Sequence, residues 1–375
     1  MAATKTALVV GGTGPTGPGI VNGLLRRGYR VTIFHRGTHE SDEIPDCVEH
    51  IHGDPHFLET IAEVLFDREY DLVVTTYGRV RFLAEHLAGK AGRFIAVGSL
   101  AATVGHFASE ALFPQGLAVP TSESAPTVAP PNAPDGKFAY RIAATERRVL
   151  ELHPTGTILR YPFIYGPHQV LPLEWCLVRR ALDKRPFLVL PDGGLRIITR
   201  GYSLNMAHAV LCAVDRSEAA AGGIFNCADE RQLTLRQVAD VIAGALGHDW
   251  EILSVPGDLA VHAWPMIYTD PKGSWHRHYS TEKIRRELGY EDVVSSVEGV
   301  ARTALWYAAR RKELGGAIED RLGDPFDYAA EDTFRADWLR LRAEFERTLG
   351  KTFQRHDHPY AHPDEPGQST DHKGR

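Results

Sequence analysis

The chain has 375 residues, of which 43% are hydrophobic and 24% are charged, values close to those of average globular proteins. Its 42 Lys and Arg residues against 48 Asp and Glu residues give a formal net charge of −6, which argues against a protein built mainly to neutralise nucleic-acid phosphates. Four scattered cysteines indicate neither a disulfide framework nor a zinc site, and no apolar run is long enough for a membrane span or a secretory signal, so we expect a cytoplasmic protein.

The first part of the chain alternates short β-branched runs with amphipathic runs. This alternation predicts βαβ crossovers and therefore a parallel sheet with helices on both faces. The expected strands are Thr6–Val10, Arg30–Phe34, Val48–His52, Asp71–Thr75, Arg93–Val97 and Thr157–Arg160. The expected helices are Pro15–Arg27, His56–Asp67, Val80–Leu87 and Lys137–Leu152.

A glycine-rich loop, within VVGGTGPTGPGIV, joins the first expected strand to the first expected helix. In such a Gly-x-x-Gly-x-x-Gly loop the first glycine permits a tight turn, the second lets the backbone approach a pyrophosphate, and the third lets the helix pack on the strand. The helix N-terminus then faces the negative charge. We therefore predict dinucleotide binding. The loop residues expected at the cofactor are Gly11, Thr13, Gly14, Pro15, Thr16 and Gly17.

This loop and three later segments resemble the extended short-chain dehydrogenase/reductases, the NAD(P)-dependent epimerase/dehydratase family. Gly53-Asp54 resembles the family's adenine-contacting Gly-Asp, residues 160–167 (RYPFIYGP) resemble its segment beside the nicotinamide, and residues 279–290 resemble its closing Lys-x-x-x-x-Leu-Gly-Tyr segment. The resemblance covers roughly residues 5–310. It implies an α/β fold, a Rossmann-type doubly wound parallel sheet with a smaller C-terminal substrate lobe, and cofactor contacts from Asp54, Thr75 and Pro162.

The expected domain organisation follows from a change of composition after Pro167. We expect a dinucleotide-binding domain over residues 1–167, and a substrate lobe over residues 168–327 that sends segments back to it. Residues 328–375 are expected to form a helix and a disordered polar tail. The Pro-rich segment Gly105–Gly136 is expected to act as a lid that orders on ligand binding.

The residues after the second strand favour NADP(H) over NAD(H). Family members that bind NAD place an acidic residue there, which bonds the ribose 2′-hydroxyl. Here the strand ends in His35-Arg36-Gly37, and no acidic residue occurs before Glu40. The planar guanidinium of Arg36 can pair with a 2′-phosphate. His35 either assists Arg36 or caps the strand.

The family performs its acid–base chemistry with a Tyr-x-x-x-Lys motif on a helix, and the matching stretch here, KFAYRIAATE, has no lysine in either register. In one register Phe138 and Ile142 take the two motif positions. In the other, Tyr140 takes the tyrosine position and Ala144 replaces the lysine. We favour the second register, with Tyr140 as the proton donor.

Two further residues complete the expected catalytic site. Ser99, in a segment that resembles the family's serine turn, is expected to orient the substrate oxygen. His168, which follows Gly166-Pro167 directly, is a further candidate because imidazole titrates near neutral pH. His50, His52 and His56 lie close together in sequence, but we expect no metal there, because the first two would point outward from a strand.

The first functional hypothesis is an NADP(H)-dependent oxidoreductase or epimerase that acts on a carbonyl or hydroxyl group of a small molecule. The missing lysine keeps two alternatives open: a dinucleotide-binding sensor or interaction protein without turnover, and a non-redox enzyme on the same fold. Some relatives of this fold with degraded catalytic motifs bind RNA, but the acidic charge balance makes nucleic acid an unlikely partner. No membrane partner is expected, and a homodimer is left open.

Overall fold

The computed structural model describes residues 4–38, 40–169, 171–260, 275–310, 316–348, 360–371 and 374. The chain forms two units, Met1–Pro325 and Phe326–Arg375, and each is described by itself. The division of the first 327 residues into two lobes therefore stays a prediction.

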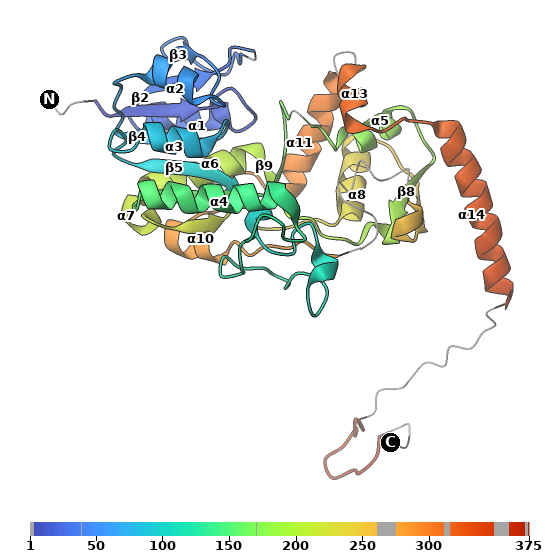
Figure 1. Ribbon diagram of the computed structural model, residues 1–375. Coiled ribbons are helices and arrows are strands. Elements are labelled where there is room, and N and C mark those ends of the chain that lie inside the picture. The colour runs from blue at the N-terminus through green and yellow to red at the C-terminus, as the bar shows by residue number, and fades with distance from the viewer. Residues whose placement is uncertain are drawn as a thin grey trace. The chain divides into compact units, whose positions relative to one another are not determined.

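A seven-stranded parallel sheet forms the centre of the first unit (Figure 1). Its strand order is β10-β6-β5-β4-β1-β2-β3, so the winding direction changes between β1 and β4. In open α/β sheets the ligand crevice lies at such a point, at the carboxyl ends of the strands. This arrangement confirms the predicted doubly wound Rossmann-type fold. The strands are β1 (Thr6–Val10), β2 (Arg30–His35), β3 (Glu49–His52), β4 (Leu72–Thr75), β5 (Phe94–Ser99), β6 (Thr157–Tyr161) and β10 (Ile224–Asn226).

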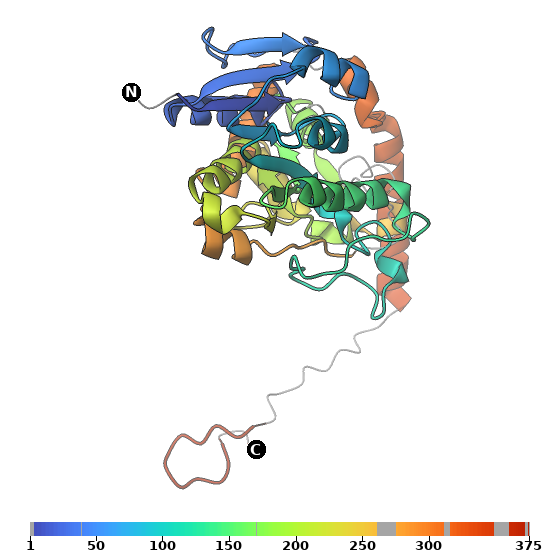
Figure 2. The same cartoon turned by 60° about the vertical axis from the view of Figure 1, so that its left-hand side comes forward.

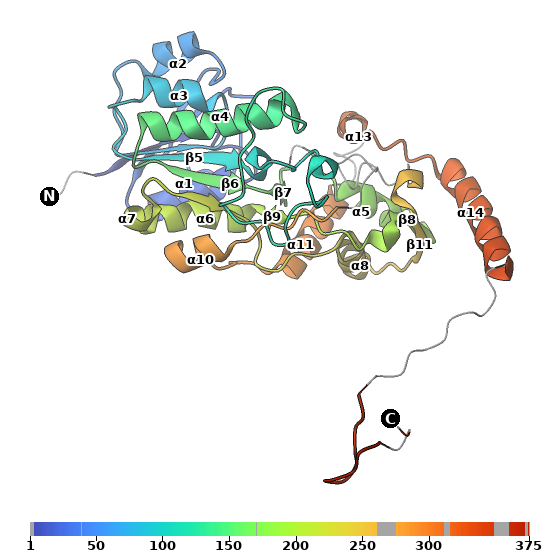
Figure 3. The same ribbon diagram turned by 60° about the horizontal axis from the view of Figure 1, so that its bottom comes forward.

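Helices cover both faces of this sheet, as Figure 3 shows. Ala7 and Val9 of β1 point into one core with helices α1 (Gly17–Arg26), α6 (Ser203–Asp215) and α10 (Glu282–Leu288). Leu8 and Val10 point into the opposite core with α2 (Leu58–Leu65), α3 (Val80–His86) and α4 (Gly136–Leu152). Burial on both faces explains why these strands read as continuous apolar runs rather than as alternating ones.

The chain after Pro167 serves two purposes. It returns β10, α6 and α10 to the large sheet, and it builds a second group of elements with two short parallel pairs, β7 with β9 and β8 with β11 (Figure 1). The remaining strands are β7 (Phe163–Tyr165), β8 (Phe187–Pro191), β9 (Arg200–Tyr202) and β11 (Glu251–Val255). The remaining helices of this unit are α5 (Trp175–Leu182), α7 (Ser217–Ala220), α8 (Leu235–Ala245), α11 (Ser296–Ala309) and α13 (Ala317–Leu322).

The segment between β5 and α4 forms a long loop beside the sheet (Figures 1 and 2). The carboxylate of Asp135 closes the loop, because it accepts hydrogen bonds from the N–H groups of Gly105 and Phe107, both at 2.8 Å. Farther along, Thr121 pairs with Tyr279 as an isolated bridge. The loop is thus anchored at its ends and near its middle, whereas Phe113 between these anchors is fully exposed. Its action as a lid stays a prediction.

The second unit contains the helix α14 (Tyr328–Thr348), whose side chains are mostly exposed. Ion pairs one turn apart, such as Arg342 with Glu346 at 2.9 Å, lie along it. Within the described parts of the chain, no helix has the length and apolar character needed to cross a membrane.

Candidate functional site

The glycine loop between β1 and α1 has the geometry of a dinucleotide cradle. Gly11 has φ +85°, and a Cβ there would lie 2.4 Å from the Cβ of Tyr77. A Cβ on Gly17 would lie 2.0 Å from the carbonyl oxygen of Gly12. At Gly14, in contrast, a Cβ would meet only the Gly11 carbonyl oxygen, at 3.6 Å. Gly11 and Gly17 are therefore required by the loop itself, and Gly14 leaves open space in which a diphosphate can approach the backbone.

The other residues expected at the cofactor lie around this cradle at different depths. Thr13 and Pro15 are half-buried, and Thr16 is buried. Thr75 is fully buried, and its hydroxyl donates to the carbonyl oxygen of Ile95 at 3.5 Å, so its side chain does not reach the crevice. The next residue, Thr76, lies beside the loop instead, with its hydroxyl 3.0 Å from the Val10 carbonyl oxygen.

The carboxyl end of β2 carries the residues expected to choose between the two cofactors. The Arg36 guanidinium lies over the ring of Tyr77, 5.4 Å from its centroid. Asp54 accepts a hydrogen bond from the N–H of His56 at 2.9 Å. His35 is 3% exposed and shares a 3.0 Å hydrogen bond with His50, and burial lowers its pKa. His35 therefore contacts β3 rather than open solvent.

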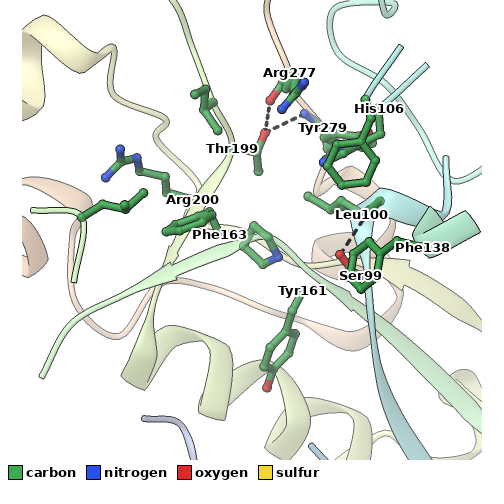
Figure 4. Close-up of a pocket in the computed structure, with 15 residues that line it drawn as sticks. Ser99, Leu100, His106, Phe138, Tyr161, Phe163, Thr199, Arg200, Arg277 and Tyr279 are labelled. Carbon is green, nitrogen blue, oxygen red and sulfur yellow. Dashed lines mark hydrogen bonds between the residues drawn. The ribbon is translucent and has the colours of Figure 1, made fainter. Parts of the chain in front are cut away.

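A cavity of about 210 Å³ lies at the carboxyl ends of β5 and β6 (Figure 4). Its walls are mostly apolar and include Pro162, the residue expected beside the nicotinamide. The Tyr161 hydroxyl points away from the other labelled side chains and donates to the Met206 carbonyl oxygen at 2.6 Å. The polar side chains that line the cavity are Ser99, His106, Thr199, Arg200, Arg277 and Tyr279, besides Tyr161.

Ser99 ends β5 and caps the short 3₁₀ turn that follows, η1 (Leu100–Ala102), where its Oγ accepts from the Ala101 N–H at 3.2 Å. It lines both this cavity and a second one of about 760 Å³, which also contains Arg79, Arg81 and Arg141. Ser99 therefore lies where we expected a substrate-orienting hydroxyl, and its role there stays a prediction.

Helix α4 presents Phe138, not Tyr140, to these cavities. Phe138 lines both of them, and Ile142, one turn later, lines the second. Tyr140 packs against the cluster that includes Ala102 and Val128, and it borders neither cavity. Residues two positions apart in a helix, such as Phe138 and Tyr140, point about 200° away from each other, so only one of the two rings can face the cavities. This geometry favours the register that we did not prefer.

A buried ion pair fixes the rotation of α4. The guanidinium of Arg160 on β6 donates two hydrogen bonds to the Glu146 carboxylate, at 2.9 and 2.7 Å. Both side chains are almost fully buried, at 1% and 4% exposed. Burial raises the pKa of Glu146, and the neighbouring Arg160 opposes that shift. Glu146 lines the second cavity together with Phe138, so the pair holds the helix with this side toward that cavity.

The cavity also contains a pair that the sequence analysis missed. His106 Nδ1 and the Tyr279 hydroxyl share a hydrogen bond of 2.8 Å. Burial, with a contribution from Arg277, lowers the pKa of His106 to about 3, and burial raises the pKa of Tyr279. Both groups are therefore neutral near pH 7. Tyr279 belongs to a segment that the family resemblance singled out, whereas no sequence signal marked His106.

Two arginines in the cavity differ in their partners. Arg200 donates to the Glu174 carboxylate at 2.5 Å, so its charge is balanced. Arg277 is 8% exposed, its Nε has no hydrogen-bond partner, and its guanidinium lies over the Phe107 ring, 5.9 Å from the centroid. Within the described residues, no carboxylate forms an ion pair with it. Burial lowers the pKa of Arg277. Thr199 holds this segment in place, because its hydroxyl donates to the Arg277 carbonyl oxygen at 2.6 Å and accepts from the Tyr279 N–H at 3.0 Å (Figure 4).

His168 lies apart from these groups. It is exposed, with φ +60°, and its Nε2 is 3.3 Å from a carboxylate oxygen of Glu43. Its ring also contacts Trp306. His168 borders neither of the two cavities.

Comparisons with proteins of known sequence find relatives over different lengths. The chain is 26% identical over 318 residues to the chloroplast stem-loop binding protein of 41 kDa b of Arabidopsis thaliana, which covers 79% of this chain and 77% of that protein. It is 26% identical over 192 residues to the uncharacterized protein YbjS of Escherichia coli. That match covers 45% of this chain and 56% of YbjS, so it spans little more than half of that relative.

Solved structures share the fold at low identity. An epimerase of Methanothermobacter thermautotrophicus superposes with a TM-score of 0.65 and 18% identity, over 83% of this chain and 94% of that one. The dTDP-glucose 4,6-dehydratase of Bacillus anthracis, solved in complex with NAD, superposes with a TM-score of 0.61 and 18% identity. The superposition covers 82% of this chain and 98% of that one. A sequence profile matches residues 7–228, more than half of the chain. The chain therefore belongs to the NAD dependent epimerase/dehydratase family.

Proposed function

We propose that this protein is an NADP(H)-dependent oxidoreductase or epimerase that acts on a hydroxyl or carbonyl carbon of a small anionic molecule. The observation that carries the proposal is the cavity at the ends of β5 and β6, which combines Ser99, Tyr279 and an unpaired Arg277. The buried Arg277 charge is stabilised by the Phe107 ring and by the charges of Asp135 and Glu110, none of which forms an ion pair with it. A carboxylate or phosphate on the substrate would pair with it directly. The substrate class is therefore anionic.

The cofactor proposal rests on the loop and on Arg36. The open space at Gly14 fits a diphosphate, and Arg36, beside Tyr77, is the cation that would pair with a 2′-phosphate. A bound nicotinamide supplies or accepts the hydride. We propose NADP(H) as the cofactor, and tighter binding of NADH than of NADPH would contradict this choice.

The acid–base step is assigned to residues of the cavity. Ser99 orients the substrate oxygen through its hydroxyl. Tyr279, kept protonated by burial, donates the proton to that oxygen, and the neighbouring charge of Arg277 favours the phenolate that remains. In the tautomer with its proton on Nδ1, His106 donates a hydrogen bond to the phenol oxygen, which holds the phenol in place and leaves the phenol proton for the substrate. Tyr279 and Arg277 would then replace the missing Tyr-x-x-x-Lys pair, and Tyr279 is better supported than Tyr140.

A titration followed by a turnover assay tests this function. We expect NADPH to bind at least tenfold more tightly than NADH, and bound NADPH to be oxidised by carbonyl compounds that carry a carboxylate or phosphate, but not by their neutral analogues. Arg277→Gln should lower kcat/KM for the anionic compounds at least tenfold and leave the cofactor Kd unchanged. The exposed Arg236→Gln serves as the control. Equal rates with charged and neutral compounds would overturn the anionic substrate class.

Two observations favour a second function, stem-loop binding without turnover. Helix α4 turns Phe138 and Ile142 toward the second cavity, and the match with the Arabidopsis relative named for stem-loop binding covers 79% of this chain. The net charge of −6 opposes it. Fluorescence anisotropy with a labelled RNA stem-loop at low and high salt separates the two functions. Tight, salt-dependent binding with no NADPH oxidation across the panel would replace the enzymatic proposal.

A further inference from the structure

Three histidines and one glutamate meet at the edge of the large sheet, outside the cavities described above. His35 ends β2, His50 and His52 lie on β3, and Glu40 belongs to the loop that joins these strands. One ring nitrogen from each histidine and one carboxylate oxygen of Glu40 all lie within 4.8 Å of one another. We infer that these four residues form a binding site for a divalent transition metal ion of the Zn²⁺ class.

The strand register explains why residues far apart in sequence converge. β2 and β3 are parallel neighbours, with Ile33 opposite His50 and His35 opposite His52. Residues two apart on a strand share a face, so His50 and His52 point to the same side of the sheet as His35. Our expectation of no metal considered His50 and His52 without His35, which belongs to the adjacent strand.

Glu40 reaches the same point because the chain turns directly after β2. Gly37 has φ +70°, and a Cβ there would lie 3.2 Å from the ring of His52. This tight turn brings the loop back over the histidines. Glu40 then lies 3.4 Å from His50 Nδ1 and 3.5 Å from His52 Nε2.

The distances between the donor atoms suit one small ion. In a tetrahedral zinc site with bonds of about 2.0–2.1 Å, neighbouring donor atoms are about 3.3 Å apart. Here His35 Nε2 is 3.0 Å from His50 Nδ1 and 3.8 Å from the nearer Glu40 oxygen. The two Glu40 distances above involve different carboxylate oxygens, Oε2 toward His50 and Oε1 toward His52. These four contacts bracket the tetrahedral value, and every pair in the set of donor atoms lies within 4.8 Å. An ion could therefore bind with small side-chain movements.

The chemical type of the four donor atoms indicates which metal would bind. Three imidazoles and one carboxylate favour Zn²⁺ and neighbouring transition metals over Mg²⁺ or Ca²⁺, which take oxygen ligands. Four protein ligands would close a tetrahedral site and leave no open position, which is typical of structural zinc. The ion would tie the β2–β3 loop to the sheet beside Arg36.

Metal binding also requires a change of tautomer at His35. The N–H of Gly37 donates to His35 Nδ1 at 3.3 Å, so Nε2 carries the proton that it shares with His50. A metal at Nε2 requires the other tautomer, with the proton on Nδ1. The contact with the Gly37 N–H is then lost, and the Gly37 amide should change its NMR shift when the metal binds.

Isothermal titration of the full-length, chelator-treated protein with Zn²⁺ alone tests the site. We expect one site per chain that His52→Gln and Glu40→Gln each weaken at least tenfold. Both side chains are more than half exposed, so neither change threatens folding. His56→Gln is the matched control, because His56 is close in sequence but outside the cluster.

A second readout identifies the coordination. Co²⁺ bound to wild-type protein should give the intense visible absorption of a tetrahedral site, and His52→Gln and Glu40→Gln should lose it. The histidines near the C-terminus stay present in every variant, so binding by that segment would survive all the substitutions. Unchanged stoichiometry and affinity in both variants, or Zn²⁺ binding that only His56→Gln weakens, would overturn the proposal.

Discussion

The glycine loop and helix α4 both border the seven-stranded sheet, but they relate to the family pattern in opposite ways. The loop keeps the three glycines, and each has a geometric reason to be glycine or, at Gly14, the open space that a ligand needs. Helix α4 is anchored to β6 through Glu146 and Arg160, and it presents Phe138 and Ile142 to the cavities. Neither register of the helix supplies the lysine of the family motif. Cofactor binding and proton transfer can therefore be tested on different residues: the glycine loop for the cofactor, and Ser99 and Tyr279 for the proton.

The largest effect is expected from breaking the anchor of α4. Glu146→Gln leaves the buried Arg160 charge without its partner, and loss of one member of a buried pair typically costs about 3–5 kcal/mol of unfolding free energy. Urea denaturation measures the change. The exposed pair of Arg148 with Glu151 is the control, because Glu151→Gln should cost less than about 1 kcal/mol. A loss below about 1 kcal/mol in Glu146→Gln would show that the pair does not hold the helix.

The next effect separates the two tyrosines. Tyr279→Phe removes the hydroxyl that lines the cavity, and general acid catalysis is worth about 10²- to 10⁴-fold, so kcat should fall at least about 100-fold. Tyr140→Phe should leave kcat within about twofold, because Tyr140 borders neither cavity. Cofactor Kd values should match wild type in both variants. A large loss in Tyr140→Phe with normal turnover in Tyr279→Phe would restore the register that the sequence favoured.

The smallest effect is expected from a substitution in the glycine loop. Gly14→Ala places a methyl group in open space, so the melting temperature should not change, while the cofactor Kd should rise about tenfold as the methyl blocks the diphosphate. Gly244→Ala, at a helix position with no neighbour within 4 Å, is the control for a harmless added methyl. An unchanged cofactor Kd in Gly14→Ala would mean that the diphosphate binds elsewhere.

The sequence by itself determined the fold and the place of the glycine loop. Strand β1 was predicted with its observed bounds, Thr6–Val10, because a strand buried on both faces is an unbroken apolar run. The loop was recognisable because glycines at fixed spacing meet local requirements of a turn and a helix start. Such signals depend on neighbours in the chain, so periodicity and motif spacing can report them.

Only the tertiary structure decided which side chains meet. The rotation of α4 depends on Arg160 of β6, 14 residues beyond Glu146, and no local pattern distinguishes Phe138 from Tyr140. Tyr279 reaches His106 across 173 residues, and His35 meets His50 through a strand register. These contacts arise from packing between distant segments. Local spacing carries no information about them, because residue type alone does not say which strand or loop a side chain will face.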